Sequence, residues 1–205
     1  MTGYAVFDIE TTGFRLRPDS IVEIAVVHVD AHGEVTGSWD TLLRPQGGDV
    51  GPSTVHGITP AMVRNAPRFT EVAADLYGLF AGRVPVAHRL TQFDGRFVDS
   101  HFSWAGIGAP GFAQGLCTWK LATRSLPLAH HTLKDCCDHL GIDLVDAHEA
   151  LVDTLATAQL LGHFIRSGQR LGGRSIPIRA ADRPPRAPIH TVLHPRGRAG
   201  RVPSA

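Results

Sequence analysis

The sequence predicts a single α/β domain with a central mixed β-sheet flanked by helices. Extended segments rich in β-branched residues come early, at residues 4–7, 21–30 and 35–45, and helical periodicity dominates from residue 59 onward. A further short strand is expected among the helices at residues 83–88. Strands grouped early with helices mixed in later are typical of such a sheet, and 205 residues can bury one good core.

The connections between these elements have recognisable signals. Residues 31–34 indicate a hairpin between the second and third strands. Thr59 is expected to cap a helix that has Pro60 at its first position, and Thr70 is expected to cap the next helix. The predicted helical segments cover residues 59–67, 69–82, 92–106, 118–126, 131–141 and 146–168.

The formal net charge of +1 conceals an asymmetry. Residues 171–205 hold seven Arg and one Asp, which gives +6 and leaves −5 for residues 1–170. That stretch also holds six prolines and has no apolar periodicity, so we predict a domain over 1–170 and a disordered tail over 171–205. The tail's charge suits nucleic acid or an acidic partner, and an inert solubilising extension is an equally good reading.

The composition argues against a membrane protein and a disulfide framework. No apolar run approaches the roughly 20 residues that span a bilayer, and no basic stretch leads into an apolar signal segment, so we expect a cytoplasmic protein without a membrane partner. The three cysteines, Cys117, Cys136 and Cys137, form no CxxC pair, which favours reduced thiols over disulfides or a zinc site.

Two acids follow the first strand. Asp8 and Glu10 are two residues apart, so on a strand they point to the same face. At the edge of a core they repel each other, and desolvation penalises both charges. A divalent cation such as Mg²⁺ or Mn²⁺ would offset this cost, because hard cations prefer oxygen ligands. If the strand has already reached solvent, both acids are simply hydrated.

Further acids have suggestive positions. Asp94 follows the strand at residues 83–88 and begins a helix, and Asp153 lies within the last helix, five residues after His148. Five residues turn an ideal helix by about 140°. His148 and Asp153 would therefore not share a face if both were helical, which places His148 in the first turn or the preceding loop.

Together these motifs resemble the DnaQ-like 3′-to-5′ exonucleases of the DEDDh group, which include the epsilon proofreading subunit of bacterial DNA polymerase III. The family's three motifs stand here as "FDIETTG", "AHRLTQFDGRFV" and "HEALVDTLATAQLL". Two further stretches match, "VHGITPAMVRNAPRFTEV" and "CTWKLATRSLP" leading into "HTLKDCCDHLGI". The resemblance covers about residues 3–166 and implies a ribonuclease H-like fold.

The resemblance also implies the catalytic set. Asp8, Glu10, Asp94 and Asp153 would hold two divalent cations, Mg²⁺ or Mn²⁺, with Asp8 bridging them. His148 would act as the general base on the attacking water, which suits a histidine with an ordinary pKa of about 6.5. Two such ions are what phosphodiester hydrolysis requires, one at the water and one at the leaving 3′-oxygen.

The substrate contacts are implied in the same way. Thr11, Thr12 and Gly13 would line the pocket for the terminal nucleotide, with His56 and Phe93 close to its sugar and base. An aromatic side chain stacks on any base. Core packing of Phe93, or a turn-capping role for His56, explains these two residues equally well.

One departure from the family falls in the second motif. Arg89 follows His88 where the family usually has Asn, and Asp94 lies six positions after His88 instead of five. The metal role of Asp94 is expected to survive this inserted residue. The contact normally made by the Asn is in doubt, and Arg89 or Gln92 are the candidates to replace it.

The resulting hypothesis is a metal-dependent 3′-5′ exonuclease. It would release nucleoside 5′-monophosphates from the 3′ end of single-stranded or frayed DNA in proofreading or repair, with a DNA polymerase subunit as a possible partner. DNA is favoured over RNA because "VHGITPAMVRNAP" is more similar to the DNA-proofreading branch. The alternatives are an exoribonuclease of the same superfamily and a nucleic-acid or polymerase-binding adaptor that has lost catalysis.

Overall fold

The computed structural model describes residues 3–145 and 148–177, and within them five strands form one mixed sheet in the order β3-β2-β1-β4-β5. The strands are β1 (Tyr4–Thr11), β2 (Ile21–Val29), β3 (Val35–Leu42), β4 (Val84–Ala87) and β5 (Leu116–Cys117). β2 is antiparallel to β1 and β3, whereas β4 is parallel to β1 and β5. The predicted α/β class with a mixed sheet is confirmed.

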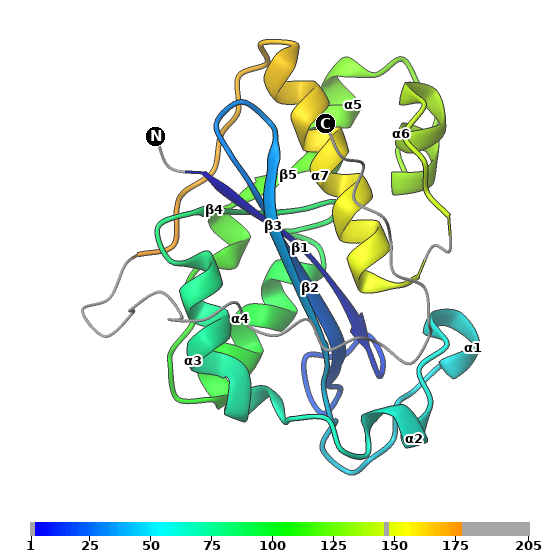
Figure 1. Cartoon of the computed structure of the whole chain (residues 1–205), viewed down its shortest axis with the longest axis vertical. Coiled ribbons are helices and arrows are strands. Elements are labelled where there is room, and N and C mark those ends of the chain that lie inside the picture. The colour runs from blue at the N-terminus through cyan, green and yellow to red at the C-terminus, as the bar shows by residue number, and fades with distance from the viewer. Residues whose placement is uncertain (1–2, 146–147, 178–205) are drawn as a thin grey trace.

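Helices cover both faces of this sheet (Figure 1). They are α1 (Ser53–His56), α2 (Pro60–Val63), α3 (Phe69–Phe80), α4 (Asp94–Trp104), the 3₁₀ turn η1 (Phe112–Gln114), α5 (Thr118–Ser125), α6 (Leu133–Leu140) and α7 (Ala150–Arg166). α3 and α4 pack on one face, and α5, α6 and α7 pack on the other.

The helix starts agree only in part with the sequence signals. Thr59 is the N-cap of α2 and Pro60 its first residue, as predicted. The predicted cap at Thr70 is wrong, because α3 begins at Phe69 with Arg68 at the N-cap. The backbone N–H of Arg68 donates to the Glu71 carboxylate, which satisfies this helix end without a threonine.

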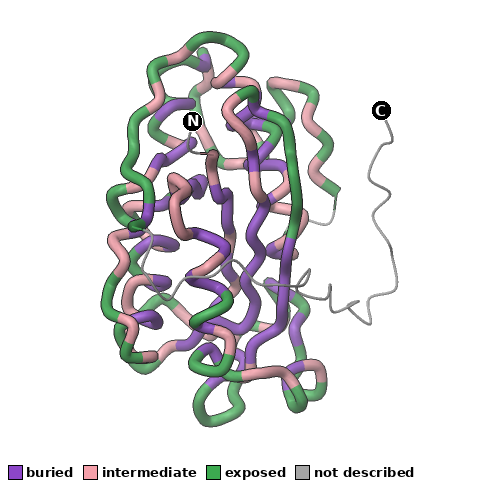
Figure 2. The backbone as a smooth tube through the Cα atoms, turned by 60° about the vertical axis from the view of Figure 1, so that its left-hand side comes forward, coloured by how far each residue is buried: buried purple, intermediate pink, exposed green. Residues whose placement is uncertain are grey.

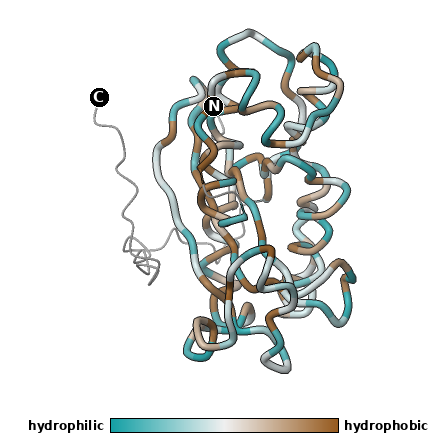
Figure 3. Tube along the Cα trace, turned by 90° about the vertical axis from the view of Figure 1, so that its right-hand side faces the viewer, coloured by the Kyte–Doolittle hydropathy of each residue, from teal (hydrophilic) through white to brown (hydrophobic). Residues whose placement is uncertain are grey.

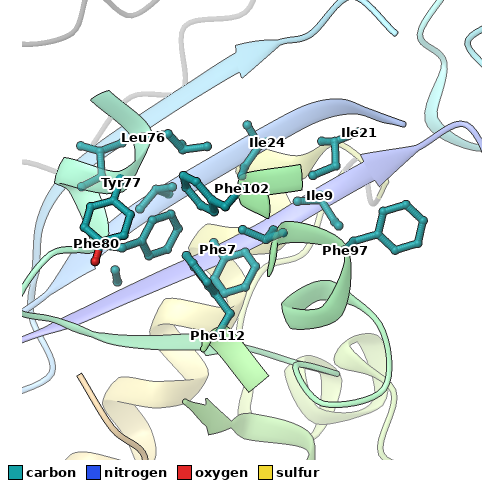
Figure 4. Packing of buried hydrophobic residues seen from close by; sticks show 14 of the residues in the cluster. Phe7, Ile9, Ile21, Ile24, Leu76, Tyr77, Phe80, Phe97, Phe102 and Phe112 are labelled. Carbon is teal, nitrogen blue, oxygen red and sulfur yellow. The ribbon is translucent and has the colours of Figure 1, made fainter. Parts of the chain in front are cut away.

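An aromatic cluster fills the layer between the sheet and the α3/α4 pair (Figure 4). Phe7 of β1 packs edge-to-face on Phe80 and on Phe112, with ring centroids 5.4 Å apart in both pairs. Ala5 and Ile9 lie on the same side of β1 as Phe7. This arrangement follows from the period-2 alternation of side chains along a strand.

The opposite face of the sheet is aliphatic. Val6 of β1 and Val27 of β2 are buried against Leu161 and Phe164 of α7. Because both faces are covered, the central strands are buried along most of their length and are mainly hydrophobic (Figures 2 and 3). β1 is therefore fixed from both sides, and so are the acids at its end.

A buried histidine joins α4 to the start of β2. The Nδ1–H of His101 donates to the Phe97 carbonyl at 2.9 Å, and its Nε2 accepts the Ile21 N–H at 3.2 Å. Burial lowers the pKa of His101 to about 4. The ring is therefore neutral at pH 7, and both of its nitrogens hold the backbone in place.

The ordered chain continues beyond the predicted domain end at residue 170. Ile176 is buried and pairs with the backbone of Gly82 and Arg83, with N···O distances of 2.9 Å. The hydroxyl of the buried Tyr77 donates to the Pro177 carbonyl at 2.8 Å. Residues 171–177 of the predicted disordered tail thus pack on the domain, and 178–205 lie outside the described residues.

Two expectations from composition concern the whole chain. In residues 3–145 and 148–177, no helix is long and apolar enough to cross a membrane. Cys117, Cys136 and Cys137 are all buried and not disulfide-bonded, as the cysteine spacing predicted.

We predict that a chain ending at residue 170 is less stable than one ending at residue 177. The shorter chain loses the buried Ile176 side chain and leaves the Tyr77 hydroxyl without its acceptor. Such losses together cost about 3 kcal/mol in free energy of unfolding. Urea unfolding of both chains, with the full-length protein as reference, measures the difference, and equal free energies of unfolding would contradict the packing of this segment.

Candidate active site

The acids of β1 project toward α7. Side chains alternate along the strand, so the burial of Phe7 and Ile9 in the aromatic cluster turns Asp8 and Glu10 to the other face, the face of Val6. Both acids are partly exposed. The predicted shared face of Asp8 and Glu10 is therefore the face that α7 covers.

A further acid joins them from β2. In the antiparallel register Glu23 lies directly opposite Glu10, so the two side chains share a face. Glu23 is fully buried, and its Oε2 accepts the N–H of Ala150, the first residue of α7, at 3.2 Å. The sequence analysis missed Glu23. The signal that could have found it was an acid inside the apolar run "IVEIAVV", in which every residue is buried.

The start of α7 brings the third motif to the same place. The helix begins at Ala150 with Glu149 at the N-cap, so His148 lies in the preceding loop, as its spacing from Asp153 predicted. His148 has a positive φ of 74°. Its backbone N–H donates to Asp153 Oδ2 at 3.2 Å, which holds the loop against the first turn of the helix.

Some of these side chains are close enough to share a cation. One ligand atom each from Glu10, His148 and Asp153 lies within 4.8 Å of the other two. Asp153 Oδ1 is buried and has no hydrogen-bond partner within residues 3–145 and 148–177. A buried carboxylate oxygen without a partner is costly, and a cation at this point would satisfy it. The residues present therefore fit a divalent metal.

Asp94 approaches from the α4 side. It is the first residue of α4 and is 6% exposed. Burial raises its pKa to about 6, although the backbone N–H groups of Asp94 and Arg89 and the Arg89 charge act in the opposite direction. Arg89, from the departing part of the second motif, thus lies in the electrostatic surroundings of Asp94.

Repulsion between the acids shows that they converge. Burial, followed by the charges of neighbouring acids, holds the pKa of Asp8 well above its usual range. In decreasing order, the acids that contribute are Asp94, Asp153, Glu10 and Glu23. Burial likewise raises the pKa of Asp153. This concentration of negative charge is what a site for divalent cations requires.

The residues after Glu10 form a tight turn. The Thr11 hydroxyl donates to the Gly13 carbonyl at 2.7 Å, and Thr12 Oγ1 accepts the Ser20 N–H at 2.9 Å. Gly51 packs directly on this turn, since a Cβ at Gly51 would lie 2.2 Å from the Thr12 carbonyl oxygen. The turn is thus rigidly held beside the acids, and its threonine hydroxyls are engaged with backbone.

His56 is placed differently from the other predicted substrate contacts. It is buried, with Nε2 3.1 Å from the Val50 carbonyl and Nδ1 accepting the Ile58 N–H at 3.0 Å. These bonds close the segment between Val50 and Ile58. The geometry is that of a turn-stabilising residue, the other role considered for His56.

Phe93, immediately before Asp94, contacts one buried ring and one exposed ring. Its ring centroid lies 4.8 Å from that of Phe97 and 5.9 Å from that of Phe14. Phe14, which the sequence analysis did not single out, is 87% exposed. These rings, with Gln92, line a cavity of about 430 Å³. An exposed aromatic directly after the Thr-Thr-Gly turn was the signal for Phe14.

A family model for exonucleases matches residues 5–161 of this sequence. This match agrees with the geometry of the site. The chain belongs to this exonuclease family. It is 31% identical over 166 residues to the DNA polymerase III PolC-type of Oceanobacillus iheyensis, covering 80% of this chain and 11% of the relative. It is 32% identical over 165 residues to that of Bacillus cereus, with the same coverage. The exonuclease chain thus spans only a small part of these relatives.

Solved structures share the fold. The nuclease domain of 3′hExo, a DEDDh family member bound to rAMP, has a TM-score of 0.69 at 18% identity, covering 85% of this chain and 97% of that one. E. coli Exonuclease I in complex with a dA16 oligonucleotide has a TM-score of 0.67 at 18% identity, covering 80% and 41%. The predicted family and ribonuclease H-like fold are confirmed.

We predict that Glu23 positions α7 through its hydrogen bond to Ala150. Glu23→Gln keeps an oxygen acceptor, so the exonuclease should retain kcat within a few-fold. Glu23→Ala leaves the buried Ala150 N–H without this acceptor, and kcat should fall roughly 100-fold through misplacement of the helix that carries Asp153. Steady-state kinetics on both folded variants measures this, and equal losses would show that the charge of Glu23 matters instead.

We also predict that Asp94→Asn stabilises the metal-free protein at pH 7. A raised carboxyl pKa stabilises the fold below the unfolded value of about 4, and this stabilisation is lost as pH rises through about 6. Removing the charge should therefore add roughly 2 kcal/mol at pH 7 and nothing below pH about 4.

The same variant tests metal binding. With EDTA, thermal unfolding of Asp94→Asn is compared with that of the unaltered protein and of Asp75→Asn, an exposed acid on α3. Added Mg²⁺ or Mn²⁺ should raise the Tm of the unaltered protein and of the control more than that of Asp94→Asn. An equal response of all three would contradict a metal role for Asp94.

Proposed function

We propose that this chain is a metal-dependent 3′-5′ exonuclease that releases nucleoside 5′-monophosphates from the 3′ end of single-stranded or frayed DNA. One observation carries the proposal. Segments far apart in the sequence, the end of β1 and the starts of α4 and α7, bring the acids Asp8, Glu10, Asp94 and Asp153 and the base His148 together. This combination is suited to phosphodiester hydrolysis.

The carboxylates Asp8, Glu10, Asp94 and Asp153 would hold two Mg²⁺ or Mn²⁺ ions, with Asp8 shared between them. The position of Asp8 supports this, because the charges of the other three acids all act on it. When bound, such ions would supply the positive charge that phosphodiester hydrolysis needs at the attacking water and at the leaving 3′-oxygen. The protein contributes a preformed cluster of oxygen ligands that repel one another until cations bind.

His148 would take the proton from the attacking water at a ring nitrogen. Its side chain is exposed, whereas its backbone N–H is held by Asp153. The ring can therefore reach substrate while its Cα stays beside the acids. A histidine ring nitrogen is a good proton acceptor in general-base catalysis, so His148→Gln should lower kcat about 100-fold or more.

The terminal nucleotide would lie between the Thr11–Gly13 turn and Phe93. The turn offers a rigid wall beside Glu10, and the Phe14–Phe93 pair offers aromatic surface next to Asp94. Such surfaces stack on any base, which suits an exonuclease that must remove nucleotides regardless of sequence.

DNA is the favoured substrate and a DNA polymerase the favoured partner. The support is the similarity to part of the DNA polymerase III PolC-type relatives. A proofreading or repair role follows from that association.

The proposal predicts a descending ladder from 5′-labelled single-stranded DNA in Mg²⁺ or Mn²⁺. An RNA of the same sequence is digested in parallel. Asp8→Ala and His148→Ala should abolish the ladder, because they remove a cation ligand and the base. Asp75→Ala, which removes an exposed acid on the other face of the sheet, should leave it unchanged.

The other outcomes identify the alternatives. A ladder on RNA alone would make the protein an exoribonuclease. Binding of both strands without shortening of either would make it a nucleic-acid-binding adaptor and would place the defect in the altered loop around Arg89.

A further inference from the structure

A second cavity, of about 510 Å³, opens on the α3/α4 face of the sheet, away from the face of Asp8 and Glu10. Its walls come from the loops after β1 and β3, the start of α3 and the end of α4. Arg17, Arg44, Arg68 and Trp104, one from each of these segments, define what we call the arginine pocket. The catalytic proposal above assigns it no role.

The charged residues that line this pocket, within the part of the chain that the structure describes, are all arginines. The histidine that lines it, His101, is neutral. Within residues 3–145 and 148–177, Arg17, Arg44 and Arg68 form no ion pair. The buried Nε of Arg44 has no hydrogen-bond acceptor in the same part of the chain. Residues 1–170 carry a net charge of −5, so this concentration of positive charge runs against the balance of the domain. The pocket is therefore suited to an anion.

The pocket also has an aromatic wall. The Arg17 guanidinium lies over the half-buried Trp104 ring, 5.1 Å from its centroid. His101 contributes only its ring surface, since both of its nitrogens bind backbone. Guanidinium groups interleaved with aromatic rings are the combination that binds single-stranded nucleic acid, because the former pair with phosphates and the latter stack on bases.

Arg17 connects this pocket to the catalytic end of the molecule. It also lines the smaller cavity, together with Phe14, Phe93 and Arg96, and Phe93 directly precedes Asp94. Among the residues that the structure describes, no acid lines either cavity. A continuous cationic and aromatic surface thus leads from Phe93, past Arg17, to Arg44 and Arg68.

We propose that the arginine pocket binds backbone phosphates of the nucleic-acid strand, 5′ to the terminal nucleotide that is removed. The inference rests on the proposed function and extends it with a second contact region on the other face of the sheet. Arg44 and Arg68 pair with phosphate oxygens, and Arg17 guides the strand around the loop between β1 and β2.

Two substrates separate strand binding from catalysis. The p-nitrophenyl ester of thymidine 5′-monophosphate occupies only the catalytic site, whereas an oligonucleotide of about twelve residues can also reach the pocket. In the full chain, Arg44→Gln combined with Arg68→Gln should raise KM for the oligonucleotide roughly tenfold and leave ester hydrolysis unchanged. The slope of log binding constant against log salt concentration should fall by about 1.4, which corresponds to two phosphates.

A single variant avoids any effect of the half-buried Arg44 on folding. Arg68→Glu changes an exposed side chain at the start of α3, where an acid is tolerated well. It should raise the oligonucleotide KM at least as much. The matched control is Arg124→Glu, an exposed arginine on α5 at the opposite face of the sheet. It makes the same charge change outside the pocket.

The outcomes are distinguishable. An oligonucleotide KM that stays unchanged, or that rises equally in Arg124→Glu, would overturn the arginine pocket as a strand site. An equal loss on both substrates would also overturn it, because the arginines would then support the fold or the catalytic site. If the unaltered protein hydrolyses neither substrate, the proposed function fails, and fluorescence anisotropy of the labelled oligonucleotide still tests the pocket by the same comparison of variants.

Discussion

The pairing of β1 with β2 determines where Asp8, Glu10 and Glu23 lie, and the other acids are arranged around them. Phe7 and Ile9 must enter the aromatic cluster, so Asp8 and Glu10 must point to the α7 face. The same register sets Glu23 opposite Glu10. A slip of one residue would bury the acids among aromatic rings, and the large cost of that arrangement specifies the register. The hydrophobic core thus holds the acids together despite their mutual repulsion.

The fold offsets this repulsion with hydrogen bonds at the start of α7. Without cations, burial and like charges raise the pKa values of Asp8, Asp94 and Asp153, so the charged site destabilises the fold. Glu23 and Asp153 each accept a backbone N–H from Ala150 and His148, respectively. These bonds fix the start of the helix to the sheet beside the mutually repelling acids, which holds the acids in place without a cation.

Local patterns were enough to predict β1 to β4 and α2 to α7, because period 2 and helix caps are local properties, whereas the short elements α1, η1 and β5 were not predicted. The loop position of His148 also followed from helix geometry alone. Glu23 could not be found in this way, since its partner Glu10 is known only once the strand register is set. The pairing of Ile176 with Gly82 was missed for a different reason. The proline- and arginine-rich composition of residues 171–205 predicted disorder, and it outweighed the one buried residue among the described residues 171–177.

The two faces of the sheet separate two electrostatic tasks. The acids need an environment in which metal ions are their cations, and arginines placed among them would compete by forming ion pairs. Strand binding needs guanidinium groups that are free to meet phosphates. Arg44 and Arg68 lie on the α3/α4 face, with the sheet between them and Asp8, and within the described residues neither forms an ion pair, although Arg44 donates one hydrogen bond to the Arg64 carbonyl. The two charge types come near one another around the start of α4, where Arg89 acts on Asp94 and Arg96 lines the cavity with Arg17. In the proposed strand path, the nucleic acid meets positive charge first and reaches the acids only with its 3′ end.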